Sequence, residues 1–200
     1  IPAFYACYDA EGNISVEGVK ALTGAIMLIT AVVIKLYDKG PVLYKQVRCT
    51  KDAKEFYILK FRSMRVDAEK DGVARLAAKN DSRITPVGKF IRAVRIDELP
   101  QLFNVLIGDM SLIGPRPHPL ALDAHYRELI PHYMDRYAVR PGMSGLAQVS
   151  GHRGPTPTTA DMAARVEYDL LYIEDWSFGL DLRILLKTVV PWWREVRRGG

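Results

Sequence analysis

The sequence predicts a mainly helical α+β fold with one small β-hairpin, attached to a membrane through a re-entrant or interfacial N-terminal helix and amphipathic helices. Apolar residues recur at helical spacing through much of the chain, which favours helices packed on one core. Residues 42–47 and 55–61 are β-rich runs joined by a polar turn, which is typical of a hairpin. Residues 21–34 form a run of 14 without a charge. With 48% hydrophobic residues among 200, the chain can bury a sizeable core.

Composition excludes several classes of protein. The only cysteines, Cys7 and Cys49, form no Cys-x-x-Cys pair, so neither a disulfide scaffold nor a zinc ribbon is expected. No Gly-rich nucleotide loop and no Gly-x-Ser-x-Gly elbow occurs, which argues against P-loop enzymes and serine hydrolases. The formal charge of +5 indicates a partner with negative charge.

The uncharged run predicts a membrane-inserted helix. A helix over residues 21–36 would be about 24 Å long, against a hydrocarbon thickness of about 30 Å, so a re-entrant piece fits better than a full span. A buried core helix is the alternative, but the run is apolar on all sides rather than striped. Basic residues follow it closely, which favours the cytoplasmic side: Lys35, Lys39, Lys45, Arg48 and Lys51.

Cap and turn residues mark the middle of the chain. The charged stretch 62–83 suggests a helix followed by a loop. Thr85 and Pro86 supply an N-cap and a first-turn proline for a helix whose apolar stripe is Val87, Phe90, Ile91 and Val94. We then expect Asp97 to cap a second helix, with the stripe Leu99, Leu102, Phe103 and Leu106.

The last part of the chain alternates turns and helices. Residues 111–119 are too rich in proline for a helix or central strand, and residues 140–157 are rich in turns. Residues 121–137, interrupted by Pro131, and 160–173 have helical composition. Residues 180–190 predict an amphipathic helix, placed at a bilayer surface or on the core, with this apolar face: Leu182, Leu185, Leu186 and Val189.

Two adjacent carboxylates, Asp97 and Glu98, form the most informative site. Unpaired amides and the positive end of a helix dipole favour negative charge beside them, which suits a phosphate with a metal ion. Asp97 could attack phosphorus as a nucleophile, while Glu98 positions a cation or handles a proton. The alternative is a simple N-cap followed by a solvated acid.

Basic residues strengthen the first interpretation. Lys60 and Arg62 would point to one face of an extended strand, and Arg116 lies between two prolines. Arg83 and Arg140 are further loop arginines. Each alone could be a solvated cation, but together with an acidic pair they indicate a diphosphate substrate bridged by a divalent ion, which we expect to be Mg²⁺.

Four stretches resemble the bacterial sugar transferase family, the monotopic phosphoglycosyl transferases. They are KFRSM at 60–64, DELPQLFNV at 97–105, GDMSLIGPRP at 108–117 and RPGMSG at 140–145. The resemblance covers about residues 21–190. It implies transfer of a sugar-1-phosphate from a UDP-sugar to undecaprenyl phosphate, releasing UMP through a phosphosugar-aspartyl intermediate. Residues 148–154 and 166–173 look most like the branch that transfers glucose-1-phosphate for exopolysaccharide synthesis.

The resemblance also implies roles for single residues. Asp97 and Glu98 match the catalytic acidic pair that holds Mg²⁺, and Lys60, Arg62, Arg83, Arg116 and Arg140 match substrate-binding positions. It divides the chain into residues 1–20, a remnant of an upstream domain or linker, 21–39, the membrane-inserted helix, and 40–200, a catalytic domain on the cytoplasmic face of the bacterial inner membrane. The first leg of the family's longer apolar segment is missing before Ala21.

Other interpretations stay open. The charge and the basic C-terminal end also fit a non-catalytic module that binds anionic lipid or nucleic acid. Its binding would fall steeply with salt and would not depend on Asp97. The enzyme interpretation expects membrane lipid, UDP-sugar and undecaprenyl phosphate as partners, expects no nucleic acid, and is compatible with a homo-oligomer. An inactive scaffold of the same fold is disfavoured because the acidic pair and its basic neighbours are present.

Overall fold

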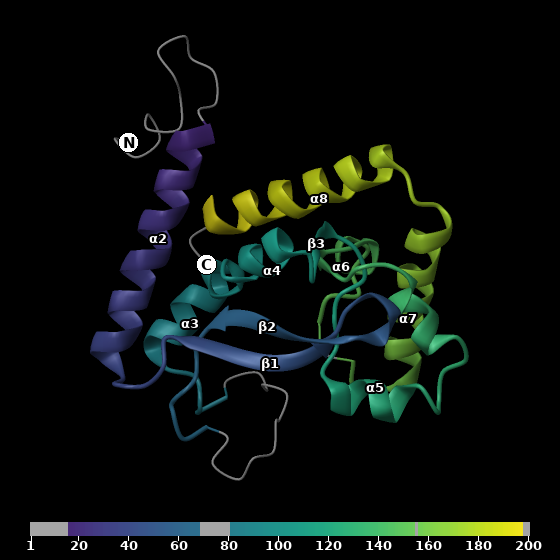
Figure 1. Cartoon of the computed structure of the whole chain (residues 1–200), viewed down its shortest axis with the longest axis horizontal. Coiled ribbons are helices and arrows are strands. Elements are labelled where there is room, and N and C mark those ends of the chain that lie inside the picture. The colour runs from purple at the N-terminus through teal and green to yellow at the C-terminus, as the bar shows by residue number, and fades with distance from the viewer. Residues whose placement is uncertain (1–15, 69–80, 155, 198–200) are drawn as a thin grey trace. The chain divides into compact units, whose positions relative to one another are not determined.

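The computed structural model describes residues 16–68, 81–154 and 156–197 of the chain, which divides into two compact units (Figure 1). The first unit takes the described parts of residues 1–44 and 60–100, and the second those of 45–59 and 101–200. The first holds the apolar helix and the acidic pair, and the second holds the Pro-Arg-Pro segment. The predicted limits 1–20, 21–39 and 40–200 stay a prediction.

The predicted β-hairpin is confirmed. Strands β1 (Leu43–Cys49) and β2 (Glu55–Phe61) form a two-stranded antiparallel sheet. The turn is the 3-10 helix η1 (Lys51–Ala53), closed by a hydrogen bond of 2.7 Å from the Thr50 amide to the Lys54 carbonyl. The boundary between the two units passes through both strands.

The apolar helix α2 (Val16–Tyr37) begins before Ala21, where the sequence predicted its start. Glu17 and Lys20, which are charged, lie in its first turns. They form an exposed i,i+3 ion pair of 2.8 Å, and a helix tolerates such a pair on its surface. With 22 residues the helix is about 33 Å long. Residues 17–37 are long and apolar enough to cross a membrane by length and composition, so the shorter length predicted from the sequence was wrong.

Helix α3 (Pro86–Ala93) begins as predicted, since the Thr85 hydroxyl accepts a hydrogen bond of 2.8 Å from the Gly88 amide. Only part of the predicted stripe is buried: Ile91 is 3% exposed, while Phe90 is 64% exposed. The described residues of the charged stretch, 62–68 and 81–83, contain no helix, contrary to the prediction. The part of that prediction covering 69–80 lies outside the described residues.

The helix expected after Asp97 differs from the prediction. Asp97 lies within the 3-10 helix η2 (Ile96–Glu98) instead of capping a helix, and α4 (Gln101–Ile107) starts only after Pro100. In α4 the buried side chains are the polar Gln101 and Asn104. The apolar residues of α4 that are most exposed are Phe103, Leu106 and Ile107.

Hydrogen bonds explain why α4 buries its polar face instead of its apolar face. The Asn104 amide nitrogen donates to the Tyr57 carbonyl at 2.9 Å, and the Asn104 amide oxygen accepts from the Leu59 amide at 3.0 Å. Asn104 therefore satisfies backbone hydrogen-bonding groups of β2 that a neighbouring strand would otherwise pair with. These bonds hold the polar face of α4 against the hairpin.

A short parallel pair lies where the sequence predicted only loops. Strand β3 (Ser111–Ile113) pairs with β4 (Gly142–Ser144), in the register Ser111 to Gly142. The two backbones approach so closely that a Cβ on Gly142 would lie 2.1 Å from the Gly114 amide nitrogen. Helix α6 (Leu146–Val149) follows, inside the region predicted to be turns.

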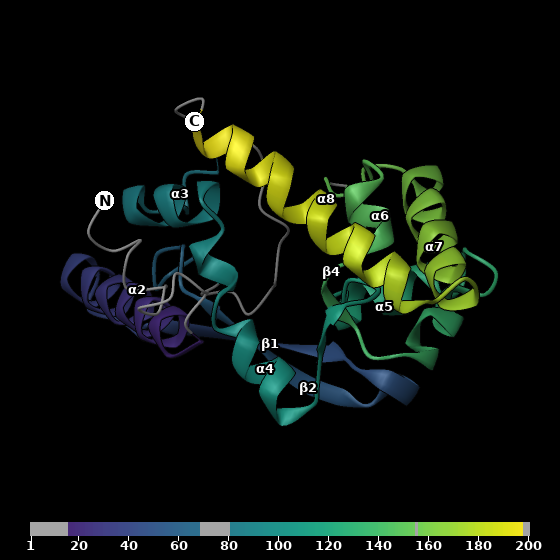
Figure 2. The ribbon, with the colours of Figure 1, turned by 90° about the horizontal axis from the view of Figure 1, so that it is seen from above.

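The helices predicted in the last part of the chain are present: α5 (Leu120–Tyr126), the 3-10 helix η3 (Tyr133–Ala138), α7 (Thr159–Glu174) and α8 (Phe178–Arg197). A capping box of Thr158 and Asp161 starts α7. In Figures 1 and 2, α6 lies beside both α7 and α8. Among residues 178–189 of α8, whose burial the structure describes, Ile184 is buried. The predicted apolar face of this helix is about half exposed: Leu182, Leu185, Leu186 and Val189.

Candidate functional site

The acidic pair stands on one tight turn of the first unit. Arg95 adopts a left-handed conformation, with φ at 60°, and this reverses the chain after α3 so that η2 can begin. Both carboxylates are partly buried. The Lys60 ammonium, from the end of β2, lies 3.0 Å from a Glu98 carboxylate oxygen, and their side chains are 21% and 17% exposed. The structure therefore brings Lys60 to the acidic pair, as the sequence predicted.

Arg62 and Arg83 bind carboxylates of their own. Arg62 is 8% exposed and contacts Asp38, just beyond the end of α2, through the Asp38 carboxylate at 3.1 Å and its carbonyl at 2.6 Å. Arg83 grips the carboxylate of Asp81 with Nε at 3.0 Å and Nη2 at 2.7 Å. Lys60 and Arg62 are only two residues apart, but they bind different partners. Arg62 binds Asp38 next to the end of α2, and Lys60 binds Glu98.

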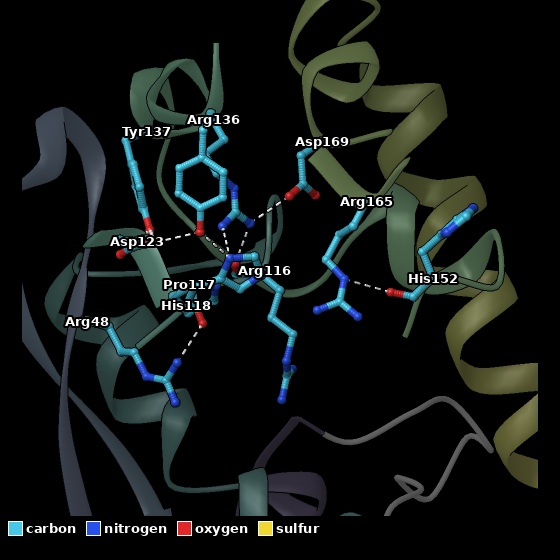
Figure 3. Close-up of polar contacts among 11 residues, drawn as sticks. Arg48, Arg116, Pro117, His118, Asp123, Arg136, Tyr137, His152, Arg165 and Asp169 are labelled. Atoms are coloured by element: carbon cyan, nitrogen blue, oxygen red, sulfur yellow. Dashed lines mark hydrogen bonds and ion pairs between the residues drawn. The ribbon is translucent and has the colours of Figure 1, made fainter. Parts of the chain in front are cut away.

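Arg116 and Arg140 belong to the second unit. Arg140 is exposed at the start of β4, and Arg116 lies in the loop after β3 between the buried Pro115 and Pro117. A buried ion pair between Arg136 and Asp169 contacts the backbone of that loop. Arg136 donates to the Arg116 carbonyl at 2.6 Å and to an Asp169 carboxylate oxygen at 2.6 Å (Figure 3). Arg48 of β1 donates to the Pro117 carbonyl at 3.2 Å.

His118 completes this cluster of side chains. Its Nδ1 accepts from Arg136 at 2.5 Å and lies 2.7 Å from the Tyr133 hydroxyl, which donates to Asp123 at 2.8 Å. Burial, followed by the charges of Arg136 and three other arginines, lowers the pKa of His118 well below its usual value, so the ring is neutral.

Burial also shifts the carboxyl groups of the cluster. It raises the pKa values of Asp123 and Asp169. Opposing this, hydrogen bonds from Tyr137 and Tyr133 favour the ionised form of Asp123, and the charge of Arg136 favours that of Asp169.

Sequence reasoning missed several polar residues of the second unit. Arg48, Arg136, Arg165 and Asp169 all act on the 116–118 loop or lie beside it. One signal was present: Arg165 and Asp169 are four residues apart in a predicted helix, so both lie on the same helix face. No comparable pattern marked Arg136, since its contacts are distant in sequence.

The donor atoms of the acidic pair suit magnesium. Mg²⁺ prefers oxygen ligands and binds proteins through one or two carboxylates together with substrate phosphates and water. Asp97 and Glu98 supply two adjacent carboxylates. Among the described residues, no group of three or more His, Cys, Asp or Glu side chains could hold a metal alone. The pair therefore fits an ion that shares its ligands with a substrate.

The first unit thus presents an acidic pair beside a lysine, and the second unit presents an arginine between two prolines. The model of the family described as bacterial sugar transferase matches residues 14–195, so the chain belongs to this family, as its motifs predicted.

Relatives with printed functions are similar over most of the chain. A UDP-glucose:undecaprenyl-phosphate glucose-1-phosphate transferase of Klebsiella pneumoniae is 51% identical over 84% of this chain and 36% of its own length. An exopolysaccharide production protein PSS of Rhizobium leguminosarum bv. phaseoli is 48% identical over 86% of each chain. A UDP-N-acetylgalactosamine-undecaprenyl-phosphate N-acetylgalactosaminephosphotransferase of Aeromonas hydrophila is 48% identical over 84% of this chain and 39% of its own length. The chain thus spans little more than a third of two of these relatives.

Proposed function

We propose that this chain carries the catalytic part of an enzyme that transfers a sugar-1-phosphate, glucose-1-phosphate in the first instance, from a UDP-sugar to undecaprenyl phosphate. UMP leaves, and the lipid-linked sugar begins an exopolysaccharide or another glycoconjugate. The names of relatives 44–51% identical to this chain support the reaction. Because the Aeromonas relative is named for N-acetylgalactosamine, the choice of sugar is the finer part of the proposal.

The proposed chemistry has two steps at one phosphorus atom. A carboxylate oxygen of Asp97 attacks the β-phosphorus, which carries the sugar, and the bond from that phosphorus to the bridging oxygen breaks, so UMP leaves with the electron pair. An oxygen of undecaprenyl phosphate then attacks the same phosphorus and releases Asp97. The lipid product therefore holds the sugar through a diphosphate.

The contact between Lys60 and Glu98 is the main structural support for this proposal. A carboxylate attacks a phosphate poorly because both are anions, so positive charge beside the nucleophile lowers the barrier. Lys60 brings an ammonium group within 3.0 Å of Glu98, the neighbour of Asp97. Mg²⁺ held by Asp97 and Glu98 would supply further neutralisation of the diphosphate.

Other predicted residues extend the proposal. Arg116 and Arg140 remain predicted substrate-binding residues, and so do Arg62 and Arg83, which contact Asp38 and Asp81. The apolar surface of α2 supports membrane attachment, with catalysis on the cytoplasmic face of the inner membrane. The exposed apolar face of α8 suits the bilayer surface.

The test is UMP release from a panel of UDP-sugars with undecaprenyl phosphate and Mg²⁺. Asp97→Asn should abolish release, because an amide oxygen is a far weaker nucleophile, while the protein stays folded and membrane-associated. Asp52→Asn is the matched control: Asp52 is exposed, and asparagine tolerates its φ of 59°. EDTA should stop release reversibly. Normal turnover by Asp97→Asn would refute Asp97 as the nucleophile. If the wild-type chain releases no UMP from any UDP-sugar and only binds membranes in a way that weakens steeply with salt, the non-catalytic module is favoured instead.

A further inference from the structure

Arg165 is a buried cation of α7 whose hydrogen bonds, within the described part of the chain, go to neutral carbonyl groups. It is 8% exposed, its Nε donates to the His152 carbonyl at 2.9 Å, and its Nη2 donates to the Gly154 carbonyl. Among the described residues its Nη1 has no hydrogen-bond partner, although this nitrogen is not one of the fully buried atoms. The two carbonyls thus fix the orientation of the guanidinium without cancelling its charge.

The charge of Arg116 acts on Arg165, and Arg48 belongs to the same group of arginines around His118. In Figure 3 the Arg116 side chain extends away from the Arg136–Asp169 pair and lies between the side chains of Arg48 and Arg165. The hydrogen bonds of Arg48 include one to the Pro117 carbonyl at 3.2 Å and one to the Gln46 amide oxygen at 2.5 Å. The three side chains come from β1, from the loop after β3 and from α7, so the fold of the second unit gathers them.

Electrostatics makes this arrangement unfavourable by itself. Burial lowers the pKa of Arg165, the charges of Arg136 and Arg116 lower it further, and Asp169 opposes them. The cations near His118 also disfavour its protonation. Like charges held close together in a partly dry place attract an anion, and guanidinium forks match the oxygens of a phosphate.

We propose that Arg165, with Arg116 and Arg48, binds one phosphate group of a substrate, and that the buried Arg136–Asp169 pair positions the loop that presents Arg116. The proposal rests on the proposed function and deepens it by assigning a second set of phosphate-binding residues in the second unit. The bound group is a phosphate ester, which either the UDP-sugar or the prenyl phosphate can supply.

The test uses the full chain in its membrane or detergent form and measures KM for UDP-glucose and for undecaprenyl phosphate separately. Arg165→Gln should raise one KM about ten- to a hundredfold, the loss expected for a hydrogen bond to a charged group, with a smaller change in kcat. Arg165→Lys should recover part of the affinity because it restores the charge. Arg127→Gln, an exposed arginine paired with Glu128, is the matched control and should change neither value.

A double-mutant cycle separates binding from a structural role. If Arg116 and Arg165 hold the same phosphate, Arg116→Gln and Arg165→Gln together should raise KM less than the product of their separate effects. A higher KM for UDP-glucose assigns the group to the nucleotide, and a higher KM for undecaprenyl phosphate assigns it to the lipid. Both KM values within twofold of wild type in a folded Arg165→Gln protein would overturn the proposal. Equal effects of glutamine and lysine would overturn it as well.

A binding measurement keeps this proposal separate from the proposed function. Inorganic pyrophosphate should raise the melting temperature of the wild-type protein, and Arg165→Gln should remove that rise. This result needs no turnover, so the site can be tested even if no UDP-sugar yields UMP. Should Arg165→Gln fail to fold, Arg165→Lys decides: an unchanged response to pyrophosphate together with unchanged KM values refutes the site.

Discussion

At the scale of the residue, Asn104 is a buried polar side chain that organises more structure than its apolar neighbours. It is 1% exposed and exchanges two hydrogen bonds with the backbone of β2. Its own carbonyl also accepts from the Asp109 and Met110 amides, which end α4 and lead the chain toward β3. A single side chain therefore fixes which face of α4 meets the hairpin.

Asn104→Leu should be strongly destabilising even though the two side chains are similar in size. The change leaves the Leu59 amide and the Tyr57 carbonyl without their partner, at a cost of about 2–4 kcal/mol. Leu106→Asn makes the reverse change at a residue 80% exposed and should cost below about 1 kcal/mol. Urea unfolding in detergent measures both, and equal effects would contradict the role given to Asn104.

At the scale of the element, local signals in the sequence predicted the start of α3 and the hairpin. Thr85 and Pro86 predicted α3, and two β-rich runs predicted β1 and β2, because caps and alternation act over a few residues. The parallel pair β3–β4 could not be predicted this way, since its three-residue strands are stabilised by a partner about 30 residues away. The polar buried face of α4 was missed for the same reason.

Gly88 tests how tightly α3 packs. Alanine inside a helix normally stabilises it by about 1 kcal/mol relative to glycine. In Gly88→Ala, however, the new Cβ would lie 1.8 Å from the Ser63 carbonyl oxygen, so we expect a net loss of at least about 2 kcal/mol. Gly179→Ala in α8 meets no atom within 4 Å and should gain a few tenths of a kcal/mol. Thermal unfolding compares the two, and a stabilised Gly88→Ala protein would contradict this packing.

At the scale of the whole molecule, the sequence pointed to the proposed reacting groups but not to the groups that hold the 116–118 loop. Asp97, Glu98 and Lys60 could be found because their types and spacing carry chemistry, and the structure joins Lys60 to Glu98. The residues that position the Arg116 loop could not be found in this way. Arg136 is 20 residues from Arg116 in the sequence, and Asp169 is 33 residues from Arg136. Nothing local distinguishes such a buried cation from a solvated one.

The neutral His118 ring should make the stability of the molecule depend on pH. An unfolded histidine binds a proton near pH 6.5, whereas the folded ring resists protonation because it is buried and because of the charges of Arg136, Arg165, Arg48 and Arg116. Below about pH 6.5 the unfolded chain therefore holds more protons, so the free energy of unfolding falls as the pH falls. Between pH 7.5 and 5.5 the free energy of unfolding should fall by on the order of 1 kcal/mol.

Replacing the ring isolates this effect from the carboxyl groups. Burial raises the pKa values of Asp123 and Asp169 above their usual value of 3.8, so these groups bind protons more readily in the folded protein than in the unfolded chain. Their protonation therefore raises the free energy of unfolding as the pH falls, which is opposite to the effect of His118. His118→Gln keeps an acceptor for Arg136 but cannot take up a proton, so its urea unfolding should lack the histidine part of the pH dependence. If both proteins lose the same stability from pH 7.5 to 5.5, His118 is not held neutral by its arginines.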